Sequence, residues 1–328
     1  MNNSKKVNLV YLLAASHSGS TLTAMLLGAH PDVCTVGELK ANSFGNVDEY
    51  RCSCMQKLRN CEFWKKVTKE VEAHGISFNI SDAGMDIRTD ASPYVLKLLN
   101  RLHRGVIFEK IRDALLFLSP NWRENMPKIQ KRNAIYIEAL STVSNSSVVV
   151  DSSKLGMRLK YLVKNPEINV KVIWLVRDGR GVSLAYKDPA HFADAKNPEM
   201  RGGGTGSVYE DARKVKKGAE EWVRCNEEAI EVLNTIPKSS WLKVQYENIC
   251  RDTDNTLDKI YDFIGLDSSL KEKNFKSVEH HVLGNGMRFD TSDEIILDER
   301  WKKELTKEEL KEFELVAGDM NRRLGYSN

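Results

Sequence analysis

The sequence has no apolar run approaching the ~20 residues that a membrane-spanning helix requires. It also lacks an excess of either charge, because 49 lysine and arginine residues stand against 46 aspartate and glutamate residues, for a formal net charge of +3. No basic stripe of the kind that binds nucleic acid is present. We therefore expect neither a membrane span nor a nucleic-acid partner, but a small anion or a hydroxylated acceptor.

The N-terminal stretch MNNSKKVNLVYLLAAS places two lysines before a short apolar run, which is the pattern of a secretory signal. Cleavage after Ala15 would, however, remove the strand that presents the turn from Ser16 to Thr21. We therefore expect a cytoplasmic protein.

Cysteine is scarce, and six cysteines in 328 residues do not make a disulfide scaffold. Three of them nevertheless crowd together in RCSCMQKLRNC, as Cys52, Cys54 and Cys61. A C-x-C pair with one further cysteine lacks the paired spacing of structural zinc sites. Reduced thiols or a local disulfide are therefore expected here in preference to a metal.

Short apolar runs alternate with helical patterns, which predicts an α/β fold with a central parallel sheet flanked by helices. Ligands of such sheets bind at the carboxyl ends of the strands, so the site should be drawn from several distant segments. The expected strands are Val7 to Leu13, Ser147 to Asp151, Val170 to Val176 and Ser240 to Gln245, and the expected helices are Ser20 to Ala29, Leu155 to Lys164, Gly181 to Lys187 and Thr253 to Ile264.

The chain reads as one domain, residues 1–328, with a helical insertion at about 40–146 where helical patterns follow one another without a convincing strand. A second irregular piece, DPAHFADAKNPEMRGGGTGS, precedes a long helix expected from Tyr209 to about Leu233. A surface loop is the simpler interpretation of this piece, and a substrate lid is the alternative.

The first strand leads into SHSGST, which is placed like a phosphate-binding loop. A Walker A loop reads G-x-x-x-x-G-K-[ST], and aligning its second glycine with Gly19 puts Ser20 where the lysine belongs. Backbone N–H groups and a helix N-terminus remain to hold one compact anion without a metal. An ordinary turn capped by Ser18 or Ser20 is the alternative.

Three further segments point to an anionic nucleotide. VIWLVRDGRGVSLAY ends a strand with Arg177, whose guanidinium can grip a second phosphate. WLKVQYENI ends another strand with Tyr246, whose ring can pack on a base. HHVLGNGMRF is a loop bracketed by glycines that carries Arg288.

SHSGSTL, LVRDGRGVS, VQYENI and GNGMR…DERWKKEL occur in an order that resembles the sulfotransferases that use 3′-phosphoadenosine-5′-phosphosulfate (PAPS). The spacing SGSTL…GAHPDV…GELK is especially similar to the tyrosylprotein and bacterial branches, and the resemblance covers most of the chain except the insertion. It implies a P-loop-like fold, PAPS as cofactor, 3′,5′-bisphosphoadenosine (PAP) as product and no required metal. It also implies that Ser18, Gly19, Ser20 and Thr21 hold the 5′-phosphosulfate, that Arg177 and Arg288 hold the 3′-phosphate, and that Tyr246 lies beside the nucleotide.

The chain departs from the family at one position. The family serine usually follows the arginine by eight residues, where this chain has Ala185. Ser183, six residues after Arg177, is the candidate substitute.

Sulfuryl transfer requires positioning, a base for the incoming hydroxyl and positive charge near the leaving phosphate. Glu38, in TVGELK, matches the glutamate that similar enzymes use as general base, although a glutamate after a strand is ordinarily only solvated. His17 lies where related enzymes carry lysine or arginine, or is simply a turn histidine. Lys154 follows another strand end, in VVVDSSK, where the family often has a basic residue.

Two other classes of protein compete with a sulfotransferase. A P-loop kinase or NTPase would use Asp151 as its magnesium-binding acid, but the missing lysine argues against it. A non-catalytic protein would bind PAP and transfer no sulfate. The acceptor of a sulfotransferase can be a glycan, a peptide tyrosine, a lipid or a small alcohol.

Overall fold

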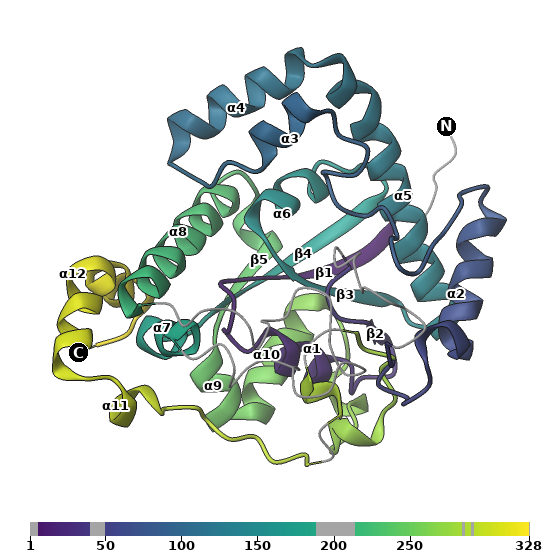
Figure 1. Ribbon diagram of the computed structural model, residues 1–328. Coiled ribbons are helices and arrows are strands. Elements are labelled where there is room, and N and C mark those ends of the chain that lie inside the picture. The colour runs from purple at the N-terminus through teal and green to yellow at the C-terminus, as the bar shows by residue number, and fades with distance from the viewer. Residues whose placement is uncertain (1–5, 40–49, 188–213, 284–285, 290–291, 328) are drawn as a thin grey trace.

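The computed structural model describes residues 6–39, 50–187, 214–283, 286–289 and 292–327. It contains one parallel sheet of five strands in the order β2-β3-β1-β4-β5, flanked by helices (Figure 1). The strands are β1 (Val7–Ala14), β2 (Val33–Thr35), β3 (Val148–Lys154), β4 (Ile168–Val176) and β5 (Trp241–Gln245). The predicted α/β class is confirmed.

The helices are α1 (Ser20–Leu27), α2 (Glu62–Ala73), α3 (Pro93–Leu99), α4 (Val106–Leu118), α5 (Pro120–Ser144), α6 (Gly156–Leu162), α7 (Gly179–Lys187), α8 (Val215–Leu233), α9 (Tyr246–Arg251), α10 (Thr253–Ile264), α11 (Trp301–Glu304) and α12 (Lys307–Leu324). Short 3₁₀ turns lie at η1 (Leu58–Asn60), η4 (Lys238–Ser240), η5 (Ser268–Leu270), η6 (Phe275–Ser277) and η7 (Gly286–Phe289). Within the described residues, no helix is both long and apolar enough to cross a membrane.

Alternating side chains of β1 divide the core into two layers, because successive residues of a strand point to opposite faces. Leu9, Tyr11 and Leu13 belong to the cluster that includes α5, α6, α8 and α12. Val10 and Leu12 belong to the cluster that includes α1, α9 and α10. Every residue from Leu9 to Leu13 is buried, as expected for a central strand covered on both faces.

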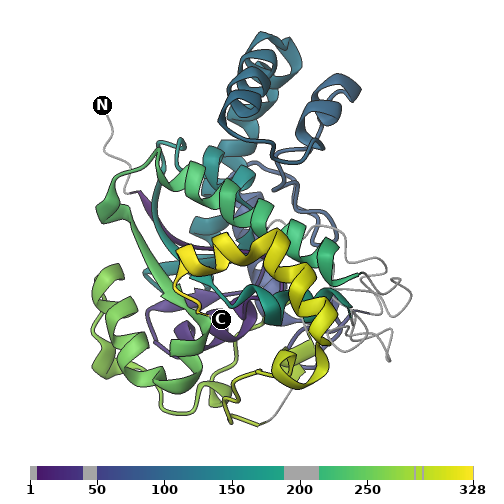
Figure 2. The same ribbon diagram turned by 90° about the vertical axis from the view of Figure 1, so that its left-hand side faces the viewer.

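The four strands and four paired helices predicted from the sequence are present, with boundaries that differ by up to three residues. The strand β2 was not predicted, because three residues are too few to show a periodic pattern. The long helix before β5 is described from Val215, and its expected beginning at Tyr209 lies outside the described residues, as does the irregular piece that precedes it. Figure 2 shows α12 lying alongside α8 on the β5 side of the sheet.

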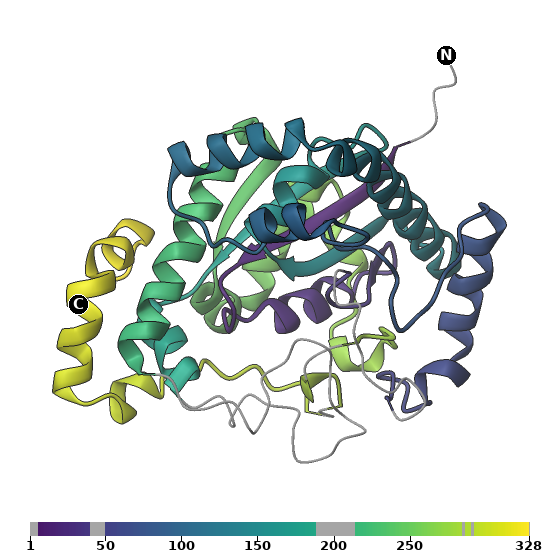
Figure 3. The same ribbon diagram turned by 45° about the horizontal axis from the view of Figure 1, so that its top comes forward.

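Residues 50–146 carry the helices α2 to α5, and no strand occurs among them. The long α5 begins at Pro120 after the Ser119 cap, and it packs on β1, β2 and β3. Figure 3 shows α2 and α12 at opposite ends of the molecule. These helices therefore supply one flank of the sheet through α5 and also extend beyond it through α2, α3 and α4.

Candidate functional site

Each strand carries a predicted site residue at or just beyond its carboxyl end. Glu38 follows β2, Lys154 ends β3, His17 follows β1, Arg177 follows β4 and Tyr246 follows β5. The sheet order places these ends in the same sequence along one edge. Since neighbouring strands lie 4.7–4.9 Å apart, the β2 and β4 ends are separated by roughly 14 Å. The edge therefore suits an elongated ligand with charged groups at two places.

The turn between β1 and α1 adopts left-handed backbone geometry at His17 (φ 62°) and Gly19 (φ 85°). A Cβ atom at Gly19 would come within 2.4 Å of the Tyr246 ring. Glycine is therefore required at position 19 both by its φ and by the close approach of the tyrosine. This contact joins the candidate anion cradle to the end of β5.

Ser18 supplies the clearest sign that the turn is built for a ligand. Its side chain is 1% exposed, and its hydroxyl has no hydrogen-bond partner within the described part of the chain. Buried polar groups are nearly always hydrogen-bonded, so an orphaned hydroxyl beside a helix N-terminus fits an anion oxygen. Ser20 is buried at the first position of α1, and Thr21 is half-buried next to it. These residues fit the 5′-phosphosulfate that the sequence predicts here.

Arg177 is 4% exposed, and both terminal nitrogens of its guanidinium donate hydrogen bonds to neighbouring groups. Its Nη1 donates to the carbonyl of His17 at 2.8 Å, and its Nη2 donates to the Oδ2 of Asp298 at 2.9 Å. Its Cζ lies 4.6 Å from the centre of the Tyr246 ring, within cation–π range. Arg177 therefore links the anion cradle, Tyr246 and the C-terminal segment.

Asp298 is a site residue that the sequence reasoning missed, although it lies in the DERWKKEL motif. Burial opposes its ionisation, but hydrogen bonds from Arg300 and Arg177 hold the pKa of its carboxyl well below the usual range. Its backbone N–H also points toward the Tyr246 hydroxyl at 3.4 Å. A negative charge is thus held directly against the arginine that is predicted to grip a phosphate.

Glu38 and Lys154 form an ion pair between Oε1 and Nζ, and both side chains are 18% exposed. Lys154 reaches this position through left-handed backbone geometry (φ 71°) and a register shift between β1 and β3. Strained non-glycine residues cluster at functional sites, so this backbone supports a functional role for the pair. The structure thus brings together two of the three predicted catalytic residues.

The loop that carries Glu38 is held by Asp151, which is fully buried. The Oδ1 of Asp151 accepts from the N–H of Leu39 at 3.1 Å, and its Oδ2 accepts from Nε of Arg158 at 3.0 Å. Arg158 also donates to the carbonyl of Met85 and to the amide oxygen of Asn133. Asp151 is therefore engaged as a structural carboxylate, which weakens its alternative role as a magnesium-binding acid.

His17 lies in the turn with its ring 5.2 Å from that of Tyr186, edge to face. Its backbone carbonyl accepts the hydrogen bond from Arg177, so the residue touches both α7 and the β4 end of the site. The catalytic role predicted for its imidazole stays a prediction.

Ser183 stands apart from the other predicted residues. Gly181 faces Arg177, since a Cβ there would lie 3.2 Å from its guanidinium, and a helix turns by about 200° over the two residues to Ser183. The backbone of Ser183 instead lies against Gly218 of α8. Its buried hydroxyl has no partner among the described residues. Its proposed role stays a prediction, as does that of Arg288, whose side chain lies outside the described residues.

We expect Ser18→Ala to weaken PAP binding by about 1.5–3 kcal/mol, the usual value of a hydrogen bond to a charged group. Ser183→Ala is the matched comparison, because it removes another buried hydroxyl without a described partner. Isothermal calorimetry of both variants, with their melting temperatures as folding control, separates the two sites. Unchanged PAP affinity in Ser18→Ala would show that this hydroxyl does not contact the cofactor.

Ser183 is tested in the same way. Weaker PAP binding in Ser183→Ala, with unchanged binding in Ala185→Ser, would support Ser183 as the substitute for the family serine.

A parallel sheet whose first strand leads through an anion-sized turn into a helix defines a P-loop-like α/β protein. Residues 166–270, which include all of β4 and β5, match the model of the Sulfotransferase family. The match covers about a third of the chain, and over these residues the chain is similar to the sulfotransferase family. No curated protein sequence matches the chain.

Solved sulfotransferases are similar to the chain at low identity. The sulfotransferase domain from the curacin biosynthetic pathway is 14% identical, with 99% of each chain covered and a TM-score of 0.47. Sulfotransferase STF9 from Mycobacterium avium is 12% identical, with 99% of this chain and 79% of that chain covered and a TM-score of 0.49. Mouse sulfotransferase SULT7A1, solved with PAP, is 14% identical, with 97% and 88% covered and a TM-score of 0.44.

Proposed function

We propose that the protein transfers the sulfuryl group of PAPS to a hydroxyl acceptor by in-line transfer, with Glu38 as the general base. The observation that carries the proposal is the row of strand ends, which runs from an acid–base pair through an anion cradle to a buried arginine. PAPS supplies an activated sulfuryl group on a nucleotide with a second, distant phosphate. The lysine of a Walker A loop is then unnecessary, because the cradle binds the 5′ end of the cofactor and Arg177 binds the 3′-phosphate.

Each residue has a distinct role in this proposal. Ser18, Gly19, Ser20 and Thr21 hold the 5′ end of the cofactor through backbone N–H groups and hydroxyls. Arg177, with Arg288, binds the 3′-phosphate, and Ser183 assists. Tyr246 packs beside the nucleotide, supported by its contacts with Gly19 and Arg177.

The chemistry is assigned to the β2, β3 and β1 ends. Glu38 takes the proton from the acceptor hydroxyl, and the ion pair with Lys154 keeps its carboxylate oriented. Lys154 and His17 provide positive charge toward the oxygen that leaves with the nucleotide. We assign the acceptor contacts to the helical insertion. A peptide tyrosine is one of the candidate acceptors, because the spacing near Glu38 resembles that of tyrosylprotein sulfotransferases.

The direct test is transfer of labelled sulfate from PAPS into a panel of glycan, peptide, lipid and small-alcohol acceptors. We expect transfer to at least one class, together with thermal stabilisation by PAP in the absence of magnesium. Stabilisation by magnesium-ATP but not by PAP would favour a kinase or NTPase. Stabilisation by PAP without transfer to any acceptor class would favour a binding protein.

We expect Asp298→Asn to tighten PAP binding by about 1 kcal/mol, or roughly fivefold. The carboxylate occupies a donor of Arg177 and repels an incoming phosphate, whereas an amide of the same shape is neutral. Calorimetry of Asp298→Asn, Arg177→Ala and the double variant measures the coupling between the two residues. Weaker binding in Asp298→Asn would instead make Asp298 a residue that positions Arg177.

A further inference from the structure

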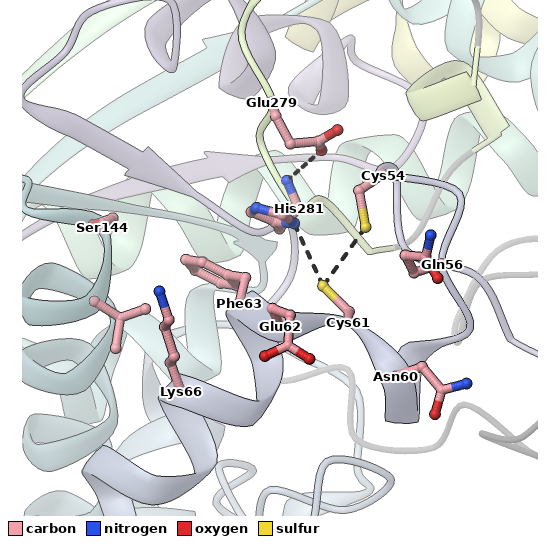
Figure 4. A pocket seen from close by; sticks show the side chains of 11 residues that line it. Cys54, Gln56, Asn60, Cys61, Glu62, Phe63, Lys66, Ser144, Glu279 and His281 are labelled. Atoms are coloured by element: carbon pink, nitrogen blue, oxygen red, sulfur yellow. Dashed lines mark hydrogen bonds between the residues drawn. The ribbon is translucent and has the colours of Figure 1, made fainter.

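Cys52, Cys54, Cys61 and His281 converge at one point, although the histidine lies 220 residues after Cys61 in the chain. Figure 4 shows three of them, Cys54, Cys61 and His281. Their potential ligand atoms all lie within 4.8 Å of one another. The Sγ atoms of Cys54 and Cys61 are 3.6 Å apart. The Nδ1 of His281 lies 3.6 Å from the Sγ of Cys52 and 3.5 Å from that of Cys61.

These separations match the edges of a zinc coordination tetrahedron. With Zn–S bonds of about 2.3 Å and Zn–N bonds of about 2.0–2.1 Å, two sulfurs are about 3.8 Å apart and a sulfur and a nitrogen about 3.6 Å. A disulfide would need sulfurs about 2.0 Å apart, and all six cysteines are free. The local disulfide considered from the sequence is therefore absent, and the fourth ligand that the cysteine spacing lacked comes from a distant segment.

The cysteines lie on a compact loop that aims their sulfurs inward. The N–H of Met55 donates to the carbonyl of Cys52 at 2.9 Å, and the N–H of Cys52 donates to the carbonyl of Gln56 at 3.0 Å. Met55 completes this tight turn with a φ of 66°. Cys61 directly precedes α2, and both it and Cys52 are buried. Backbone hydrogen bonds thus hold the loop that carries the cysteines.

His281 is held in place by its own set of contacts. Its ring stacks on Phe63 with centroids 4.4 Å apart, and its backbone has an unusual φ of 49°. Glu279 accepts from the N–H of His281 at 2.9 Å and from the hydroxyl of Ser53, the residue between two of the cysteines, at 2.7 Å. These contacts fix the backbone of His281 and the plane of its ring beside the cysteines.

We propose that Cys52, Cys54, Cys61 and His281 bind one Zn²⁺ ion as a structural site. Three sulfurs and one imidazole nitrogen in a tetrahedral arrangement are the donors that zinc prefers. Four protein ligands leave no open position for a catalytic water, so the ion stabilises structure and does not take part in sulfuryl transfer. The zinc site is independent of the proposed enzymatic activity.

The ion would fasten the start of the helical insertion to residues 279–283. The N–H of Leu283 donates to the carbonyl of Val36 at 3.1 Å, and Leu283 forms a bridge with Gly37, immediately before Glu38. The metal site is therefore linked to the proposed base, Glu38, through the contacts of Leu283 with Val36 and Gly37. Loss of the ion should loosen the Glu38 loop as well as lower stability.

The first test is metal analysis of the full chain, purified without a polyhistidine tag, by inductively coupled plasma mass spectrometry. We expect about one zinc per chain in the wild type and in Cys225→Ser, whose cysteine lies on α8 far along the chain from the cluster. Cys52→Ser and His281→Ala should lose most of the zinc. Iron in place of zinc, or no metal with three free thiols or with a disulfide, would overturn the proposal.

A second test does not depend on the variants folding. Cys54 and His281 are only half-buried and line an open pocket of about 720 Å³, so a chelator can reach them (Figure 4). Chelation of the wild-type protein should lower its melting temperature, and added Zn²⁺ should restore it whereas Mg²⁺ should not. Cobalt substitution should give the absorption of a tetrahedral thiolate site. A melting temperature that chelation leaves unchanged, in protein shown to have lost its metal, would contradict a structural ion.

Discussion

Replacement of Glu38 by glutamine should lower turnover by about 10²–10⁴-fold and leave PAP affinity unchanged. The acceptor hydroxyl must lose its proton as the new S–O bond forms, and a carboxylate can take that proton whereas an amide of the same shape cannot. Glutamine can still accept a hydrogen bond from Lys154, so the local structure should persist. Single-turnover rates at saturating acceptor, compared with PAP affinity from calorimetry, measure the two effects separately.

A comparison variant lies in the same site. Lys154→Met removes both the ion-pair partner of Glu38 and the positive charge assigned to the leaving oxygen, so turnover should also fall, although the base itself remains. The pH dependence of the rate adds a further readout, because loss of the base should abolish the acidic limb of the profile. Near wild-type turnover in Glu38→Gln would transfer the role of base elsewhere, with His17 the next residue to test.

Replacement of Arg177 by alanine should weaken PAP binding by about 1.5–3 kcal/mol, which is roughly 10- to 150-fold. The change removes the guanidinium that lies against Tyr246 and leaves the half-buried carboxylate of Asp298 with Arg300 as its one charged partner among the described residues. We also expect a lower melting temperature, because Asp298 loses Arg177 as an ion-pair partner. Calorimetric titration with PAP, in protein shown to be folded, measures the change in binding free energy.

Arg180→Ala is the matched control for Arg177→Ala, because Arg180 lies on the same turn but pairs with Asp178 and the C-terminal carbonyl of Ser327. It should bind PAP as the wild type does. Equal losses in the two variants would show that the effect comes from the local fold, and unchanged affinity in Arg177→Ala would remove Arg177 from the site.

The sequence predicted the sheet well because its central strands contain continuous apolar runs, such as Leu9–Leu13 and Val172–Val176, that are typical of buried parallel strands. It also placed Lys154 and Arg177 at one edge, since parallel strands end on the same side, whereas Glu38 was assigned through the family resemblance. It missed β2, whose three residues carry no periodic signal. Its element boundaries differ from the observed ones by up to three residues, most of all at the carboxyl end of β3.

Long-range partners were the part of the site that local patterns do not encode. Asp298 contacts Arg177 across 121 residues, and His281 joins three cysteines across more than 200 residues. Motif spacing reports only residues that share a turn or an element, so the cysteines alone looked incomplete as metal ligands. The side of α7 that Ser183 presents follows from where α8 packs, which no local motif records.

The contacts of Arg158 bear on attempts to exchange helices between this chain and a sulfotransferase. Asp151 secures the Glu38 loop and Arg158 at once, and Arg158 donates in turn to the backbone carbonyl of Met85 and to the side chain of Asn133. A graft that replaces Asn133, or that moves the backbone carbonyl of Met85, would leave a buried guanidinium short of acceptors, and breaking a buried charged network costs several kcal/mol. The helices of residues 85–133 and the Glu38 loop are therefore coupled through Asp151 and Arg158, and an exchange of these helices should keep Asn133 and the backbone at Met85.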